Sequence, residues 1–343
     1  MTVLNNRKTV VPNELDFNTH GRRDYNVIFE HPSSWEFYLV PLTVIVGEHA
    51  QPGQGMYVNG STHGNEYEGP IVIKSLLHSL RETDVLGRII LIPVLNVAAF
   101  RSGTRDTVED GVNLNRAFPG SPKGSWTHRL ADFVTQSIFP QVHVVFDLHA
   151  GGQTLCFPPL PSFHHDLDDS RKRLETEELA RGFGTKFTLA YQNTTPGLLT
   201  SCAESLGKIT LGAELGYGES VSPVGIATGN RGVLNALMQS GQLKKNELPS
   251  PICAPQDQVL VDTSDSDCSL LAEFDGYFEP AISIGTEVQK GEPICYLHDF
   301  NRIDERPLKY TAPHDGFITC QAWKNRVNRG AIISQVARTI AWK

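Results

Sequence analysis

Apolar positions near the N-terminus follow a β-like pattern. Two segments rich in β-branched and aromatic residues, 25–29 and 35–46, flank the turn-forming residues 31–34. Together they predict a hairpin over about residues 20–47 that leads into the main sheet.

Strands and helices then alternate along the chain. The short apolar run 56–58 is followed by apolar positions at helical spacing over 70–80, and then by the near-continuous apolar run 87–96. Such a run is typical of a parallel strand that is covered on both faces. A helix over 126–137 and a similar strand over 142–149 repeat the pattern. This order of elements predicts an α/β fold.

The C-terminal portion has a different pattern. A proline-rich stretch, 246–257, predicts a linker between a first domain of residues 1–245 and a smaller all-β domain of residues 258–343. Within the smaller domain, a segment that starts at Asp275 has a second copy that starts at Asp315, which predicts a pseudo-symmetric β sandwich. This arrangement resembles the barrel-sandwich fold of lipoyl and biotinyl carriers. Because no acceptor lysine motif lies between the copies, the sequence favours a packing or oligomerisation role.

Composition narrows the possible partners. The chain has 343 residues, of which 40% are hydrophobic and 20% charged, as in ordinary globular proteins. A net charge of −8 and the lack of a basic run argue against nucleic acid and anionic membranes as partners. The apolar run 89–100 is interrupted by Pro93 and Asn96 and is too short to span a bilayer, and no signal-peptide pattern follows the start, so we expect a cytoplasmic protein. The six cysteines lack CxxC spacing, which predicts reduced thiols.

Candidate metal ligands occur at two predicted strand ends. His63 and Glu66 lie three residues apart in a glycine-flanked turn after the apolar run 56–58, and His149 ends the strand over 142–149. Taken alone, the first pair is more typical of a solvated helix start at which Glu66 favours the helix N-terminus. Ligand sites of α/β sheets lie at the carboxyl ends of strands, where the three side chains would converge. Two histidines and one carboxylate suit zinc with a water in its fourth position.

Further charged residues are candidates for catalysis. The long loop 100–120 carries Arg105 and Arg116, and guanidinium groups bind carboxylates and stabilise oxyanions. Glu214 ends a predicted strand over 208–214, where it can serve as a general base. The alternatives are surface arginines in salt bridges and a solvated glutamate.

The polar segment 163–181 offers a competing metal site. It contains His164, His165 and three nearby aspartates, at positions 166, 168 and 169. We interpret it as a polar loop that enters a charged helix, and not as a second metal site.

Four motifs, in order along the chain, resemble one known family. They match the pattern of the succinylglutamate desuccinylase/aspartoacylase family, which is related to zinc carboxypeptidases, over roughly residues 40–240. The flanking residues look most like the branch that deacetylates Nα-acetyl-L-2,4-diaminobutyrate in ectoine catabolism. The motifs are His63-Gly-Asn-Glu66, Asn113-Leu-Asn-Arg116 with Arg105 before it, Asp147-Leu-His149, and Glu214-Leu-Gly.

The resemblance implies a zinc-carboxypeptidase-like mixed sheet flanked by helices and a zinc-dependent amidohydrolase. One zinc ion per subunit would be held by His63, Glu66 and His149. Glu214 would be the base, and Arg105 would polarise the amide carbonyl and stabilise the oxyanion.

The resemblance also implies a small acyl amino acid as substrate. Asn115 and Arg116 would hold its α-carboxylate, while Glu204 and Asp110 are candidates for binding a side-chain ammonium group. A desuccinylase, an aspartoacylase, a carboxypeptidase or a non-catalytic metal-binding module remain alternatives. The sequence leaves the oligomeric state open between a monomer and a homo-oligomer such as a dimer.

Overall fold

A computed structural model describes residues 7–31, 35–165, 169–192, 195–246 and 248–343. Its elements up to residue 214 are β1 (Lys8–Val10), β2 (Gly21–Glu30), β3 (Phe37–Val46), β4 (Gly55–Gly60), α1 (Glu68–Ser79), β5 (Arg88–Ile92), α2 (Val97–Ser102), α3 (Trp126–Phe133), β6 (Val142–His149), β7 (Leu155–Cys156), β8 (Leu160–His164), α4 (Ser170–Arg181), β9 (Phe187–Tyr191), α5 (Leu199–Ser205) and β10 (Ile209–Glu214). The remaining elements are α6 (Pro223–Gln239), β11 (Val259–Asp262), β12 (Ser269–Leu271), β13 (Gly276–Pro280), β14 (Glu287–Val288), β15 (Pro293–His298), β16 (Leu308–Thr311), β17 (Gly316–Ala322), β18 (Arg326–Val327) and β19 (Ile332–Ile340).

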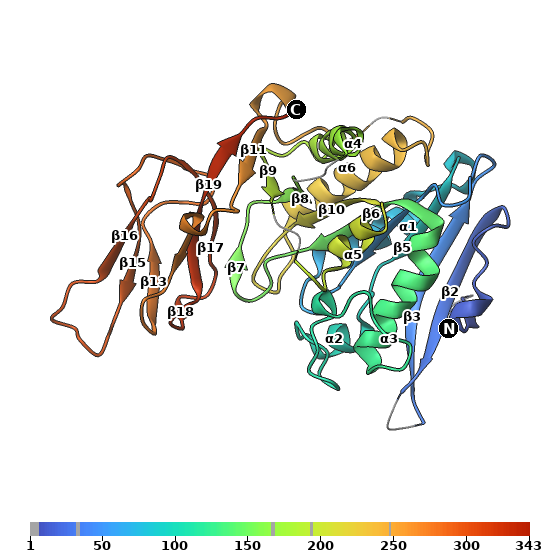
Figure 1. Ribbon diagram of the computed structural model, residues 1–343, viewed down its shortest axis with the longest axis horizontal. Helices are drawn as coiled ribbons and strands as arrows, with labels where there is room; N and C mark the ends of the chain where they lie inside the picture. Colours follow the sequence, from blue (N-terminus) through green and yellow to red (C-terminus); the bar gives the residue numbers. More distant parts are fainter. Residues whose placement is uncertain (1–6, 32–34, 166–168, 193–194, 247) are drawn as a thin grey trace.

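The predicted α/β fold is confirmed as a large mixed sheet with helices on both faces (Figure 1). The sheet order is β1-β2-β3-β5-β4-β6-β10-β8-β9-β11-β19-β17-β14. Strands β5, β4, β6 and β10 are mutually parallel, so their carboxyl ends lie at one edge. The predicted hairpin is β2 paired antiparallel with β3; most of its predicted turn, residues 32–34, lies outside the described residues.

Alternating side chains of the central strands divide the interior into two cores. Tyr57 and Val145 pack with Trp126 of α3 and Leu199 of α5 on one face. On the other face, the strand residues that alternate with them pack against α1 and α6. Burial on both faces explains why these strands have near-continuous apolar sequences. One consequence matters for the site: residues 147 and 149 of β6 share the α3/α5 face with Val145.

The C-terminal portion is joined to the large sheet by strand pairing. β11 pairs in parallel with β9 and antiparallel with β19, so hydrogen bonding continues past the predicted linker. A separate antiparallel sheet has the order β16-β15-β13-β18, and its residues Phe278 and Leu297 share an apolar core with Val336 of β19. These strands form the left side of Figure 1. The domain limits, the barrel-sandwich arrangement and the carboxypeptidase-like topology stay predictions.

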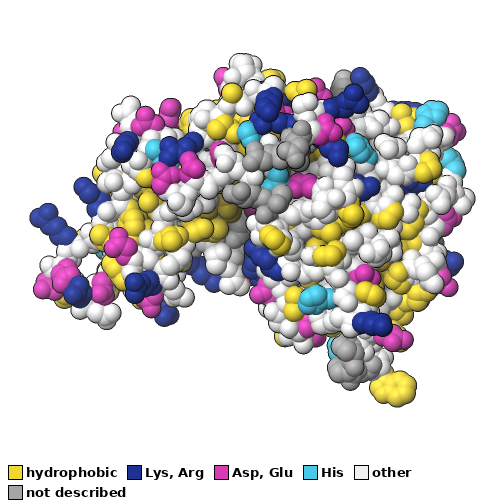
Figure 2. Space-filling view, viewed as in Figure 1, with side chains coloured by type: hydrophobic (Ala, Val, Ile, Leu, Met, Phe, Trp, Pro, Cys, Tyr) yellow, Lys and Arg dark blue, Asp and Glu magenta, His cyan; other side chains and the backbone are white. Residues whose placement is uncertain are grey.

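The surface and the thiols match an ordinary globular chain. On the face drawn in Figure 2, the Lys and Arg side chains that are described are interspersed with Asp and Glu. All six cysteines are unpaired. In the described ranges, no helix is both long enough and apolar enough to cross a membrane.

Candidate active site

The turn between β4 and α1 holds the first two candidate ligands. It begins at Ser61, whose φ of 56° lies in the left-handed region that non-glycine residues seldom adopt. Gly64 lies so close to α2 that a Cβ atom there would be 2.0 Å from the Ala99 carbonyl carbon. Both ligand candidates are consequently held deep in the protein, with His63 3% and Glu66 2% exposed. The contact with α2 leaves no room for a side chain at position 64.

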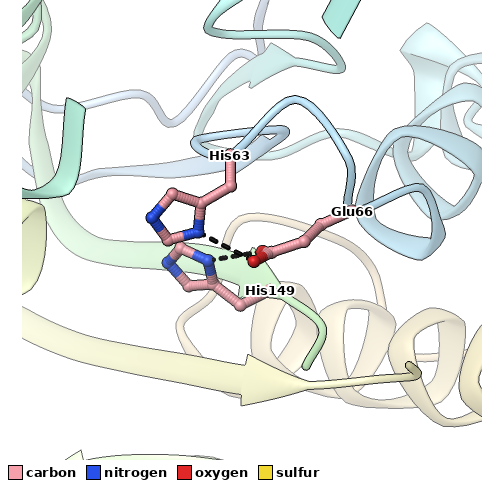
Figure 3. Close-up of side chains that lie close together, drawn as sticks. All are labelled: His63, Glu66 and His149. Atoms are coloured by element: carbon pink, nitrogen blue, oxygen red, sulfur yellow. Dashed lines mark hydrogen bonds and ion pairs between the residues drawn. The ribbon is translucent and has the colours of Figure 1, made fainter. Parts of the chain in front are cut away.

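The structure brings His63, Glu66 and His149 together (Figure 3). The Nδ1 atom of His63 lies 2.8 Å from Glu66 Oε1, and that of His149 lies 2.8 Å from Glu66 Oε2. The centroids of the two imidazole rings are 4.9 Å apart. The candidate ligand atoms of the three residues all lie within 4.8 Å of one another. Side chains from two distant segments therefore meet at one point.

This cluster fits a zinc ion by its donors and by its surroundings. Both Nδ1 atoms face the same carboxylate, while the opposite ring nitrogens have other partners: His149 Nε2 lies 2.7 Å from Asp147 Oδ2 and His63 Nε2 lies 3.2 Å from Asn113 Oδ1. Histidines that bind metals usually have such a partner on the other nitrogen, which holds the ring in place. A set of two histidines and one carboxylate matches the preference of zinc.

Asp147 contacts a candidate ligand, although the family motif that contains it assigned it no role. It is fully buried on β6, where it accepts hydrogen bonds from Asn59 Nδ2 (2.8 Å) and Thr62 Oγ1 (2.7 Å). The sequence could have indicated this contact, because residues two apart on a strand point to the same side and Asp147 therefore lies beside His149. Because Thr62 lies in the turn between β4 and α1, this turn helps to hold the carboxylate that orients the imidazole.

The charged groups of the cluster stabilise one another's ionised forms. Burial acts to raise the pKa of Glu66, but the two histidines outweigh burial and hold it well below its usual value. Burial likewise lowers the pKa of His149, but Asp147 and Glu66 raise it well above its usual value. Because opposite charges face one another here, the carboxylate and the imidazole each favour the ionised form of the other.

Glu214 occupies the neighbouring strand end. In the sheet register it is the partner of His149, so its side chain lies on the same face as the cluster. Its Oε2 is buried and makes no hydrogen bond with the described residues. Burial, followed by the nearby negative charge of Glu66, raises the pKa of Glu214 to about 8. Glu214 is therefore suited to binding and releasing a proton near neutral pH.

The arginines and Asn115 line the same cavity, which has a volume of about 460 Å³. Arg105 Nη1 lies 3.3 Å from Glu66 Oε1, and its side chain remains 48% exposed. Arg116 is exposed and donates a hydrogen bond of 2.6 Å to the Asn115 carbonyl. The Asn115 side chain accepts one from the Leu199 amide at 2.8 Å and thereby joins its loop to α5. All the predicted site residues thus border one space.

The two candidates for ammonium binding have different surroundings. Both Asp110 oxygens accept hydrogen bonds at the start of α3, two of them from Thr127, so this residue has a structural role. Glu204 lies on α5 and binds His164 in the cavity wall. The interpretation of segment 163–181 as a polar loop is wrong for His164, which is a buried residue of β8, and correct for the helix α4. Positions 166 and 168 lie outside the described residues.

Comparisons with known proteins agree with the site. The family description "Succinylglutamate desuccinylase/Aspartoacylase catalytic domain" matches residues 52–239. The chain is 34% identical over 310 residues to the N-alpha-acetyl-L-2,4-diaminobutyric acid deacetylase of Halomonas elongata, covering 90% of this chain and 88% of the relative.

Two solved structures share nearly the whole fold. A succinylglutamate desuccinylase/aspartoacylase from Rhodobacter sphaeroides has a TM-score of 0.88 at 31% identity, covering 96% of this chain and 98% of the other. The product-bound ectoine utilization protein EutE (DoeB) from Ruegeria pomeroyi has a TM-score of 0.86 at 30% identity, covering 94% and 97%. The chain therefore belongs to the succinylglutamate desuccinylase/aspartoacylase family of deacylating hydrolases.

Proposed function

We propose that this protein is a zinc-dependent amidohydrolase that converts Nα-acetyl-L-2,4-diaminobutyrate to L-2,4-diaminobutyrate and acetate in ectoine degradation. The observation that carries the proposal is the meeting of a three-residue ligand cluster, a buried glutamate and an arginine around one cavity. The choice of substrate is supported by the similarity to the Halomonas elongata deacetylase.

His63, Glu66 and His149 would hold the zinc ion. When bound, zinc lowers the pKa of a water molecule to about 7 and polarises the amide carbonyl. Asp147 and Asn113, next to the Nε2 atoms, would keep the two imidazoles in the orientation in which both Nδ1 atoms face Glu66.

Glu214 is the proton carrier of the proposed reaction. Its carboxylate accepts a proton from the attacking water as the new C–O bond forms, and it returns a proton to the amide nitrogen as the C–N bond breaks. The free Oε2 atom is available for this exchange. Its raised pKa favours keeping the proton on the carboxyl between the two steps.

Arg105 and Arg116 would each bind a different negatively charged group of the substrate. Arg105 is near the cluster but half-exposed, so it can leave Glu66 and donate to the oxygen on which charge develops. Asn115 and Arg116 adjoin the cluster at the border of the cavity, where they are placed to bind the α-carboxylate. The substrate is then held by its carboxylate while its amide lies between Arg105 and Glu214.

A turnover screen tests the proposal. Zinc-loaded enzyme is incubated with the Nα-acetyl derivatives of L-2,4-diaminobutyrate, ornithine, glutamate and aspartate, and with Nα-succinylglutamate. We expect the highest kcat/KM with the diaminobutyrate derivative, loss of turnover after chelation, and recovery when zinc is restored. A preference for acidic side chains would overturn the substrate, whereas full activity of the chelated protein would overturn the metal-dependent reaction.

A further inference from the structure

The wall of the active-site cavity contains a second polar group that the proposed reaction does not use. His164 of β8, Thr210 of β10 and Tyr191 of β9 all border the cavity, together with the ligand cluster and Glu214. We call these three residues the deep row. They come from three neighbouring strands of the sheet and point to the α3/α5 face.

A buried glutamate binds two members of the deep row. The Glu204 carboxylate lies 2.7 Å from His164 Nδ1 and accepts a hydrogen bond from the Thr210 hydroxyl. Both side chains are largely buried, with that of His164 7% and that of Glu204 8% exposed. Because the helix that carries Glu204 also packs against β10 and β6, this carboxylate is held behind the cavity wall.

The hydrogen bond to Glu204 determines what His164 presents to the cavity. When Nδ1 donates to a carboxylate, the neutral ring carries its lone pair on Nε2. Within the described part of the chain no hydrogen bond engages that atom. The Glu204 carboxylate lies directly behind the His164 ring, and the ring of Tyr191 lies beside it at a centroid distance of 5.8 Å. An aromatic ring and an imidazole acceptor with a carboxylate behind it together suit an ammonium group.

The deep row lies farther from the carboxyl ends of β6 and β10 than the reaction centre does. Thr210 and Glu214 are on the same strand and face, four residues apart, and both border the cavity. The residue between them on that face is Gly212, and a Cβ there would lie 2.7 Å from Ser162 Oγ. Glycine at position 212 lets the Ser162 hydroxyl pack against β10, and both residues border the cavity between the two ends.

The two ends of the cavity carry different charged groups. Arg105 and Arg116 provide positive charge beside the carboxylates of the ligand cluster, and Glu204 provides a carboxylate behind the deep row. We propose that His164 and Glu204, supported by Thr210, form a subsite for the side-chain ammonium group and restrict the enzyme to Nα-acylated diamino acids. This inference rests on the proposed amidohydrolase function and adds the residues that select the substrate.

Matched substrate pairs test the subsite. Nα-acetyl-L-2,4-diaminobutyrate is compared with Nα-acetyl-L-norvaline, in which a methyl group replaces the ammonium group, and Nα-acetyl-L-ornithine with Nα-acetyl-L-norleucine. In the zinc-loaded enzyme we expect the cationic member of a pair to be strongly preferred. In Glu204→Gln that preference should fall about 10- to 100-fold, chiefly through KM, as expected for loss of a hydrogen bond to a charged group. Turnover of the neutral member should change little.

Controls separate selection from folding. Glu177→Gln changes another buried carboxylate, one paired with Arg173 on α4, and should leave the preference intact. If Glu204→Gln unfolds, as judged by thermal denaturation, Thr210→Val and His164→Gln replace it. Isothermal titration of free L-2,4-diaminobutyrate into the zinc-loaded protein should show weaker binding in each of these variants.

The outcomes of the two proposals are distinguishable. Equal losses for both members of a pair in Glu204→Gln, or a wild-type enzyme that cleaves neutral and cationic members equally well, would overturn the subsite while the amidohydrolase stands. A preference for Nα-acetylglutamate would overturn both the subsite and the choice of diaminobutyrate. No turnover of any acyl amino acid by the zinc-loaded enzyme would overturn the proposed function itself.

Discussion

Two ends of one sheet face carry different kinds of polar group. At the carboxyl ends of β6 and β10, Glu66 and His149 face one another directly, each changes the pKa of the other, and both change the pKa of Glu214. In the deep row, a single carboxylate lies behind a histidine and reaches the cavity through it. The difference indicates that one end carries the reaction and the other selects the substrate, so substitutions should separate the two.

The largest effect is expected from Glu214→Gln. An amide cannot exchange a proton, so kcat should fall about 10²- to 10⁴-fold, the usual contribution of general acid–base catalysis. Steady-state kinetics on zinc-loaded protein measures the loss, and metal analysis should give the wild-type zinc content. Binding of L-2,4-diaminobutyrate should persist, since the deep row is unchanged. Near-normal turnover would assign proton transfer to another group.

Arg105→Ala tests the stabilisation of the oxyanion at the end of the sheet face that carries the reaction. Loss of one oxyanion donor typically lowers kcat about 10²- to 10³-fold. The exposed Arg101, on α2, offers a matched control, because Arg101→Ala removes a nearby positive charge that does not border the cavity. If both variants lose activity equally, Arg105 acts through the general charge of this surface and not through a contact with the substrate.

Asp147→Asn should weaken metal binding and leave selection unchanged. The carboxylate lies 2.7 Å from His149 Nε2, and loss of such a partner usually lowers metal affinity about 10- to 100-fold. Competition with a chromophoric chelator measures the zinc dissociation constant, while the ratio of kcat/KM for the diaminobutyrate and norvaline substrates should stay constant. An unchanged dissociation constant would show that Asp147 is a structural residue of the sheet.

The smallest effect is expected from Gly212→Ala, which links the two ends. The added methyl group would meet Ser162 Oγ, and displacement of this hydroxyl into the cavity should raise KM for the diaminobutyrate substrate roughly fivefold, which corresponds to about 1 kcal/mol. Nα-acetylglycine, which has no side chain to lie over this position, should be unaffected. The second substitution Ser162→Ala should restore KM. A loss that the double variant keeps would place the substrate elsewhere in the cavity.

Much of the reaction end could be predicted from the chain. The predicted strand over 142–149 coincides with β6, and the helix predicted over 70–80 largely coincides with α1. Because parallel strands end at one edge, assigning three strand ends was enough to bring His63, Glu66 and His149 near Glu214. Contacts across the edge, such as that of Asp147 with Thr62, followed only from the packed structure.

The deep row could not be predicted from local sequence patterns. His164 is followed by polar residues, including His165 and Asp169, and for this reason the buried strand β8 was not predicted. β8 pairs antiparallel with β10, which places Ser162 beside Gly212, and no periodicity in either segment encodes that pairing. In the same way, the proline-rich stretch 246–257 predicted a boundary, yet β11 pairs with β9.

The sequence by itself determined the period of each strand and helix, the polar residues at strand ends and the identity of the donor atoms, because these depend on neighbours along the chain. Only the tertiary structure decided which strands lie side by side, which carboxylate supports which histidine and where a glycine leaves room. The physical reason is that pairing and packing bring together residues far apart in sequence, and their free energy belongs to the assembled sheet and not to any segment.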